Sequence, residues 1–260
     1  MIGILGASQY ESVLETQNER TVVTTRFGDV PVLKGEIEGR EIAYIRRFGW
    51  ENNLASDVVN HAANALAFRS LGVRRVITMN GFGGVSQEVQ VNDLVIYNDY
   101  IRMVERSPTT IFVGEPRWPR AHMKEPFCPE VRDALAEASR ENSGRRVIDR
   151  AVNICVQGPH DETPAEIEAY RRLGADIICT TVYPEVVYFR ELEMCFAGIC
   201  WVCDMAGEDD ERDWVMISPE ELAPIMRAAV AAIPDTAKCA CQSTWAGNEE
   251  KLPAWYREMR

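Results

Sequence analysis

Short β-branched runs alternate with amphipathic helical stretches along the whole chain, and this alternation restricts the fold more than any other feature of the sequence. It predicts an α/β protein, because alternating strands and helices build a sheet covered by helices. Strands are expected at residues 2–5, 41–46, 76–79, 94–97, 151–156, 176–179 and 194–203. The sequence contains no internal repeat, low-complexity tract or Gly/Ser linker. We therefore expect a single domain over residues 1–260, with a short C-terminal tail from about residue 239.

Two helix starts are marked by capping residues. Thr163-Pro164-Ala165-Glu166 places threonine at the N-cap, proline at the first helical position and glutamate three residues after the cap. Ser218-Pro219-Glu220-Glu221 repeats this pattern before a helix that reaches about residue 233. Further helices are expected near residues 58–72, where apolar residues recur at helical spacing, and over residues 184–193.

The net charge limits the kinds of molecule that the chain is expected to bind. The chain carries 28 Lys and Arg against 40 Asp and Glu, a formal net charge of −12. Such an acidic chain is not expected to bind nucleic acid or an anionic membrane, although one local pocket can still attract a small anion. No apolar run approaches 18 residues, and residues 1–6 are too few for a signal sequence. A cytoplasmic location is expected.

Five strand-to-loop junctions are candidates for a ligand site, because ligands of open α/β sheets bind at the carboxyl ends of the strands. These junctions are residues 6–8, 46–49, 80–84, 158–162 and 203–204. Four contain glycines, whose backbone N–H groups can approach a ligand closely. One offers two arginines and two offer carboxylates, so together they could bind an anion and a polar organic group.

Each junction also has a purely structural interpretation. The glycines at 80–84 would be expected in any tight turn. Arg46 and Arg47 are adjacent, so one points inward and needs a carboxylate or a phosphate, while a surface salt bridge is the simpler alternative. Glu162 could be a solvated acid favoured by a helix dipole. Asp204 follows a strand that is apolar apart from cysteine, which favours a role in binding or transfer.

No metal site is expected from these patterns. His122 and His160 have no Cys or His neighbours at metal-ligand spacing, and no Ser-His-Asp set can be assembled. Cys239-Ala240-Cys241 supplies only two ligands, so a zinc site would need two more. Reduced, partly buried thiols are the default for the eight cysteines of a cytosolic protein.

Taken together, the junctions identify a family resemblance. The chain resembles the trimeric purine nucleoside phosphorylase and methylthioadenosine phosphorylase family over roughly residues 2–233. The resemblance is carried, in order, by GILGAS at 3–8, NHAANAL at 60–66, NGFGGV at 80–85, EPFCP at 125–129, GPHDET at 158–163 with AE at 165–166, GAD at 174–176 and PEVV at 184–187. No single segment is diagnostic, but their order and spacing are specific.

This resemblance implies a nucleoside phosphorylase-like fold, with a central mixed β-sheet flanked by helices. It implies a pentosyltransferase that cleaves the N-glycosidic bond of a purine nucleoside with inorganic phosphate as co-substrate. The expected substrate is 5′-methylthioadenosine or a related 5′-modified nucleoside, giving free base and a ribose 1-phosphate derivative for purine salvage. No cofactor is implied, and the expected assembly is a homotrimer or a dimer of trimers.

The resemblance also assigns roles to individual residues. The phosphate-binding group is Ser8, Arg47, Asn80, Gly81 and Thr181. The group around the base and ribose is Phe82, Gly83, Glu162, Thr180 and Asp204. Asp204 is also the catalytic residue, matching the base-binding aspartate of the adenine-type branch, whereas Glu162 matches the glutamate of the 6-oxopurine branch. His122 would reach the 5′ pocket of a neighbouring subunit.

Several positions depart from the family pattern. Phe48 and Gly49 stand where the family has a histidine beside the phosphate arginine, and Ala206 replaces a second aspartate. Two alternatives therefore stay open, namely a divergent member that hydrolyses or otherwise transforms a nucleoside-like substrate, and a non-catalytic nucleoside-binding relative. A set of five cysteines further resembles the disulfide-bearing members of the family: Cys128, Cys195, Cys200, Cys239 and Cys241.

Overall fold

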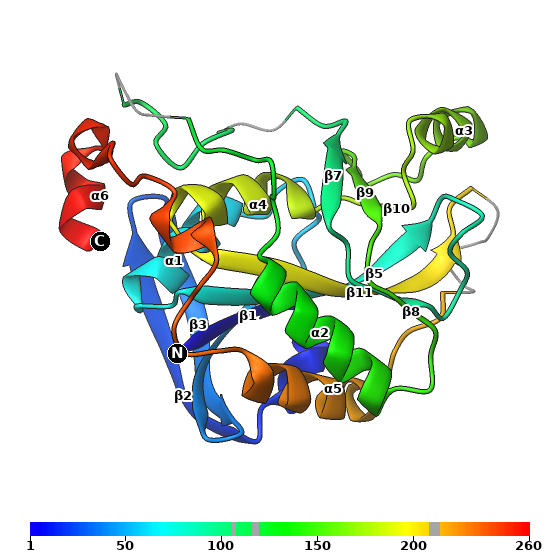
Figure 1. Ribbon diagram of the computed structural model, residues 1–260, viewed down its shortest axis with the longest axis horizontal. Helices are drawn as coiled ribbons and strands as arrows, with labels where there is room; N and C mark the ends of the chain where they lie inside the picture. Colours follow the sequence, from blue (N-terminus) through cyan, green and yellow to red (C-terminus); the bar gives the residue numbers. More distant parts are fainter. Residues whose placement is uncertain (106–107, 116–119, 208–213) are drawn as a thin grey trace.

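The computed structural model describes residues 1–105, 108–115, 120–207 and 214–260 (Figure 1). Its strands are β1 (Ile2–Gly6), β2 (Thr16–Thr25), β3 (Gly28–Ile37), β4 (Arg40–Arg46), β5 (Arg75–Gly84), β6 (Leu94–Val95), β7 (Asp99–Arg102), β8 (Val147–Ile148), β9 (Val152–Cys155), β10 (Ile177–Cys179) and β11 (Cys195–Met205). Its α-helices are α1 (His61–Ser70), α2 (Pro129–Asn142), α3 (Pro164–Arg172), α4 (Val182–Glu191), α5 (Pro219–Ala232) and α6 (Ala254–Met259). Short 3₁₀ helices are η1 (Ser8–Val13), η3 (Ala240–Ser243) and η4 (Glu249–Lys251).

These strands form one mixed sheet with helices on both faces. The main path runs β2-β3-β4-β1-β5-β10-β9-β7, and β11 pairs with β5 and β6 beside it. Helices α1 and α4 cover one face, while α2 and α5 pack together on the other (Figure 1). This arrangement confirms the predicted α/β class with a central mixed sheet. Within the described ranges, no helix is long and apolar enough to cross a membrane.

Strand β5 is the centre of the sheet. Its first half runs parallel to β1 and β11, and its second half pairs antiparallel with β10 through Gly83 and Gly84. The glycine-rich segment at 80–84, expected as a turn, is therefore the second half of a strand. The neighbours are close at Gly84, where a Cβ would lie 2.6 Å from Met205 Sδ, so a larger residue would require the methionine side chain to move.

Strands with a continuous apolar sequence were predicted well, whereas partly exposed strands and helices were not. Six expected strands correspond to β1, β4, β5, β9, β10 and β11, but the one expected at 94–97 is only Leu94–Val95. The β2–β3 hairpin, β7, β8 and α2 were missed. β3 has exposed residues at several positions, so it lacks the continuous apolar run used to find the others. The helix expected at 184–193 is α4, which begins two residues earlier.

The C-terminal tail packs on its own chain. The sequence is equally compatible with residues 252–256 docking on a neighbouring chain or fraying. Leu252 and Tyr256 are instead buried, with the Tyr256 ring 5.3 Å from Phe112 between centroids. Arg260 Nε lies 2.6 Å from Glu193 Oε2, and this ion pair fixes the end of the chain against the turn before β11.

Candidate active site

A cavity of about 630 Å³ opens at the carboxyl end of the central strands. All five junctions contribute to its wall, as expected from the general rule for α/β sheets. Loop segments before α1 and after β11 complete it. Its lining residues are Ala7, Gln9, Tyr10, Phe48, Asn52, Ser56, Met79, Asn80, Gly81, Phe82, Gly83, Gly158, Pro159, His160, Asp161, Glu162, Pro164, Ile178, Cys179, Thr180, Thr181, Trp201, Cys203, Asp204, Ala206, Gly207, Trp214 and Met216.

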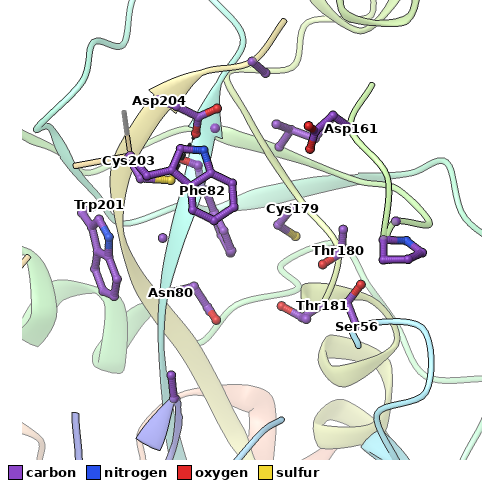
Figure 2. A pocket seen from close by; sticks show the side chains of 18 of the residues that line it. Ser56, Asn80, Phe82, Asp161, Cys179, Thr180, Thr181, Trp201, Cys203 and Asp204 are labelled. Atoms are coloured by element: carbon purple, nitrogen blue, oxygen red, sulfur yellow. Dashed lines mark hydrogen bonds between the residues drawn. The ribbon is translucent and has the colours of Figure 1, made fainter. Parts of the chain in front are cut away.

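The polar groups of this cavity divide between two ends. Figure 2 shows the carboxylates of Asp204 and Asp161 at one end. The Asn80 amide and the hydroxyls of Thr180 and Thr181 lie at the other. A ligand that spans the cavity would therefore meet carboxylates with one part and neutral hydrogen-bonding groups with the other. This polarity suits an elongated molecule with a nitrogen-rich end and an oxygen-rich end.

An irregularity in β11 directs Asp204 into the cavity. The register with β5 shifts between Val202, which pairs with Phe82, and Asp204, which pairs with Gly83. Cys203 is the extra residue of this bulge, so two adjacent side chains both reach the cavity, whereas regular strand neighbours point to opposite faces. The Cys203 thiol lies 3.1 Å from Asp204 Oδ1. The bulge thus sets both the position and the polar contact of the carboxylate.

Glu162 places a third acid in the same cavity, beside Asp161 and Asp204. Partial burial raises the pKa of its carboxyl, and the negative charges of Asp161 and Asp204 raise it further. The capping box of α3 holds the adjacent backbone, since the Thr163 amide donates to Glu166 Oε2 at 2.8 Å. A carboxyl group at this position can form a hydrogen bond with the edge of a bound base.

Trp201 is a cavity residue that the sequence did not reveal. Its indole is 1% exposed, and its Nε1 has no hydrogen-bond partner among the described residues. The ring packs edge-on against Tyr10 with 5.0 Å between centroids. A Cβ at Gly81 would lie 2.8 Å from Trp201 Nε1, so glycine at this position leaves room for the edge of the indole. The donor was missed because Trp201 belongs to an otherwise apolar strand.

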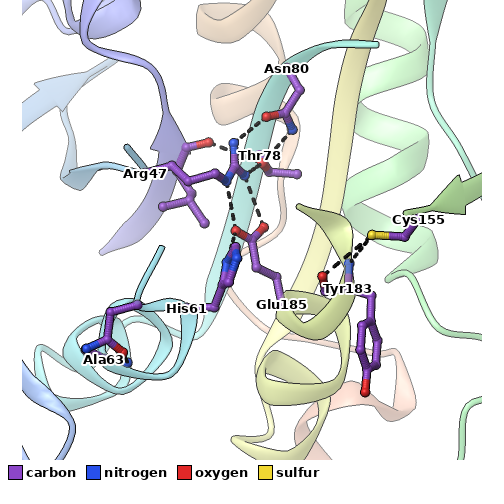
Figure 3. A network of polar contacts seen from close by, with 10 residues as sticks. Arg47, His61, Ala63, Thr78, Asn80, Cys155, Tyr183 and Glu185 are labelled. Atoms are coloured by element: carbon purple, nitrogen blue, oxygen red, sulfur yellow. Dashed lines mark hydrogen bonds and ion pairs between the residues drawn. The ribbon is translucent and has the colours of Figure 1, made fainter. Parts of the chain in front are cut away.

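Arg47 lies one layer behind the cavity in a buried polar network (Figure 3). Its guanidinium bonds both carboxylate oxygens of Glu185 at 2.8 and 3.1 Å and also donates to Thr78 and Asn80. His61 Nδ1 lies 2.9 Å from Glu185 Oε1. Burial opposes ionisation of Glu185, but Arg47 and His61 outweigh it and lower the pKa to about 2. The inward arginine has a carboxylate as its anion, and it holds the Asn80 amide from behind.

The structure brings most of the predicted residues together. Eight line the cavity: Asn80, Gly81, Phe82, Gly83, Glu162, Thr180, Thr181 and Asp204. Three do not. Arg47 contacts the cavity through Asn80, Ser8 is half-buried at the start of η1, and His122 is exposed on the surface of the chain. The roles assigned to all these residues stay predictions.

The fold and cavity define an α/β protein that binds a small ligand at the carboxyl edge of a mixed sheet. A family profile described as "Phosphorylase superfamily" matches residues 1–237. The chain belongs to this superfamily, and the resemblance seen in the sequence is confirmed.

Named relatives come from both substrate branches. The chain is 34% identical over 257 residues to the probable S-methyl-5′-thioinosine phosphorylase of Methanopyrus kandleri, covering 95% of this chain and 98% of the relative. It is 34% identical over 249 residues to the S-methyl-5′-thioadenosine phosphorylase of Pyrococcus furiosus, covering 92% and 95%. A solved methylthioadenosine phosphorylase from an Antarctic soil metagenomic library superposes with a TM-score of 0.88 at 25% identity, covering 98% of this chain and 96% of the other.

Proposed function

We propose that the protein is a pentosyltransferase that cleaves the N-glycosidic bond of a purine nucleoside with inorganic phosphate. The observation that carries this proposal is the two-ended cavity, with carboxylates at one end and an amide with hydroxyls at the other. Asp204 faces the purine, and Asn80, the Gly81 backbone and Thr181 face phosphate. The products are the free base and a ribose 1-phosphate derivative, and no cofactor takes part.

The reaction places opposite demands on the two ends. As the glycosidic bond breaks, positive charge grows on the ribose ring and negative charge on the leaving purine. Asp204, held by the Cys203 bulge, would keep a proton at the purine N7 and so stabilise the leaving base. The phosphate end would hold the nucleophile against the anomeric carbon. The bound phosphate then attacks the bound nucleoside without a separate encounter in solution. Both contributions are larger in the transition state than in the bound substrate.

The substrate that we propose is 5′-methylthioadenosine or a close 5′-modified relative. Two relatives that are each 34% identical to this chain are named for methylthioinosine and methylthioadenosine. These names support a 5′-methylthio group but do not decide between the two bases. Asp204 supports adenine, because the sequence resemblance places asparagine there in 6-oxopurine enzymes. Glu162 is the feature that would allow a 6-oxopurine instead. A cytoplasmic homotrimer or dimer of trimers, with His122 entering a neighbour's 5′ pocket, completes the proposal.

One observation favours hydrolysis as the second candidate. Glu185 neutralises the Arg47 charge behind the wall, and Phe48 occupies the position of the family histidine in the cavity lining. The phosphate end thus offers an amide, hydroxyls and backbone N–H groups without a cation facing the ligand among the described residues. Such a site could also hold water as the nucleophile.

Product release from methylthioadenosine and methylthioinosine, with and without phosphate, separates these candidates. We expect adenine to be released only with phosphate, and methylthioribose 1-phosphate to form in equal amount. Asp204→Ala should lower kcat by about 100-fold or more, because it removes proton transfer to the leaving base. Asp204→Asn should shift the kcat/KM ratio toward methylthioinosine. Phosphate-independent release would establish the hydrolase instead.

A further inference from the structure

Four cysteines from three distant parts of the chain meet at the amino end of β11. Cys128 precedes α2, Cys195 begins β11, and Cys239 and Cys241 flank the start of η3. Their sulfurs all lie within 4.8 Å of one another. Cys239 Sγ is 3.6 Å from Cys128 Sγ and 3.5 Å from Cys195 Sγ. The two ligands that the Cys-Ala-Cys motif lacked in the sequence are thus supplied by the fold.

This spacing fits a single tetrahedral ion. Zn–S bonds of about 2.3 Å in a tetrahedron separate the sulfurs by roughly 3.8 Å, close to the distances observed. The sulfurs are too near one another to surround a cluster of several irons. All eight cysteines lie among the described residues and are free thiols. Cys200, grouped with these four in the sequence, lies five residues along β11 from Cys195 and so on the opposite face.

The surroundings supply hydrogen-bond donors to sulfur. Arg75 Nη1 and Gln242 Nε2 each lie 3.6 Å from Cys195 Sγ. Arg75 is 4% exposed, and its Nη2 has no hydrogen-bond partner among the described residues. Glu130 accepts from the Cys239 amide at 2.5 Å and pairs with Arg75 at 3.1 Å, which orients both. A zinc bound by four thiolates carries a net charge of −2, which a buried cation and N–H donors to sulfur beside it would stabilise.

We propose that Cys128, Cys195, Cys239 and Cys241 form a structural zinc site. Four protein ligands leave no open position, so the ion is structural and does not bind substrate. Zinc joins the start of α2, the start of β11 and the segment after α5, and it thereby fastens the C-terminal tail to the sheet. This proposal revises our expectation that the chain holds no metal.

The site is separate from the proposed active site. Cys195 pairs with Arg75 at the amino end of β5, whereas Asp204 pairs with Gly83 near its carboxyl end. The two sites therefore occupy opposite ends of the same pair of strands. Loss of zinc should lower stability and leave ligand contacts in the cavity intact, so the zinc proposal and the proposed function can fail independently.

Metal analysis of the full chain, purified without chelator, tests the proposal directly. We expect one zinc ion per chain. Titration of four thiols with a mercurial reagent should release it in proportion to the thiols that react. Cobalt substitution should give the visible bands of a tetrahedral thiolate complex. Cys239→Ser, at the most exposed of the four positions, should weaken zinc affinity by about 10-fold or more in competition with a chromophoric chelator. Cys200→Ser, a buried cysteine outside the cluster, should retain full zinc.

Three results would overturn the zinc site. They are four free thiols that take up no zinc after reconstitution, an intact mass lower by four hydrogens because two disulfides have formed, and stoichiometric iron. If Cys239→Ser does not fold, the wild-type protein decides the question. Chelator treatment should lower its thermal midpoint and added zinc should restore it, and an unchanged midpoint on removal of bound metal would refute the structural role.

Discussion

At the scale of single residues, the buried pair of Arg47 and Glu185 has the largest energetic consequence. Both side chains are at most 1% exposed, so neither charge can be solvated if the other is removed. We expect Glu185→Gln to lower the free energy of unfolding by about 3–5 kcal/mol, measured by urea denaturation, because it leaves a buried guanidinium without its carboxylate. The Asn80 amide should also lose its fixed position.

A double-mutant cycle supplies the control for this pair. Arg47→Met combined with Glu185→Gln removes both charges and should recover part of the lost stability. If the changes in the free energy of unfolding caused by the two single substitutions simply add, the two charges do not stabilise each other, contrary to what their distances indicate.

Trp201 is the second residue with a specific expectation. Trp201→Phe keeps a ring in the cavity wall and removes the buried Nε1 donor, which has no hydrogen-bond partner among the described residues. If this donor bonds the substrate, kcat/KM should fall by about 3- to 10-fold, the worth of one hydrogen bond. Trp245→Phe is the matched control, because its Nε1 donates at 2.8 Å to the Glu191 carbonyl, outside the cavity. Equal effects of both variants on kcat/KM would show that the Trp201 donor is not used.

At the scale of elements, helix α3 links local capping to the cavity. Pro164, its first residue, and Glu162, just before its cap, both line the wall. Thr163→Ala removes the cap and should cost about 1 kcal/mol of stability, with a rise in KM larger than the fall in kcat. Ser218→Ala removes the equivalent cap of α5, where Ser218 Oγ accepts a hydrogen bond from the Glu221 amide at 3.2 Å. It should cost similar stability and leave KM unchanged.

The sequence predicted elements and junctions better than contacts. Apolar runs identified the central strands, and the rule that ligands bind at carboxyl ends selected five junctions that all reach the cavity. For the 46–47 arginine pair it left two alternatives open, an inward arginine with an anion and a surface salt bridge. It could not say that the anion is Glu185, 138 residues away, because that pairing depends on how α4 packs. The Trp201 donor was likewise not predicted, and the sequence grouped the four clustered cysteines with Cys200 without showing that only the four meet, since the fold alone brings them together.

At the scale of the whole molecule, Glu191 makes stability depend on pH. It lies at the end of α4, where its carboxylate accepts from Thr110 Oγ1 and from the Ile111 amide at 2.7 Å. Burial raises its pKa to about 7, from an ordinary value of 4.5, and these hydrogen bonds only partly oppose the shift. The folded state therefore favours the protonated carboxyl, and this contribution is complete below pH 4.5 and lost as pH rises through 7.

We expect the free energy of unfolding to fall by on the order of 3 kcal/mol over that interval because of Glu191. Glu191→Gln keeps an acceptor for the Ile111 amide and should flatten the profile, as followed by urea denaturation at a series of pH values. Glu137→Gln, on the exposed face of α2, should leave the slope as it is. An unchanged slope in Glu191→Gln would assign the pH dependence to other groups.

The bulge at Cys203 has a consequence for how this site tolerates changes in chain length. A substitution at Asp204 alters one chemical group in a fixed position. Deletion of Cys203 would restore regular alternation, leave Asp204 opposite Gly83 and remove the thiol that contacts its carboxylate. A change of chain length in this short stretch should therefore disturb the site more than a conservative substitution does. Substrate preference can drift by replacement of residues, but the length of β11 has to stay the same.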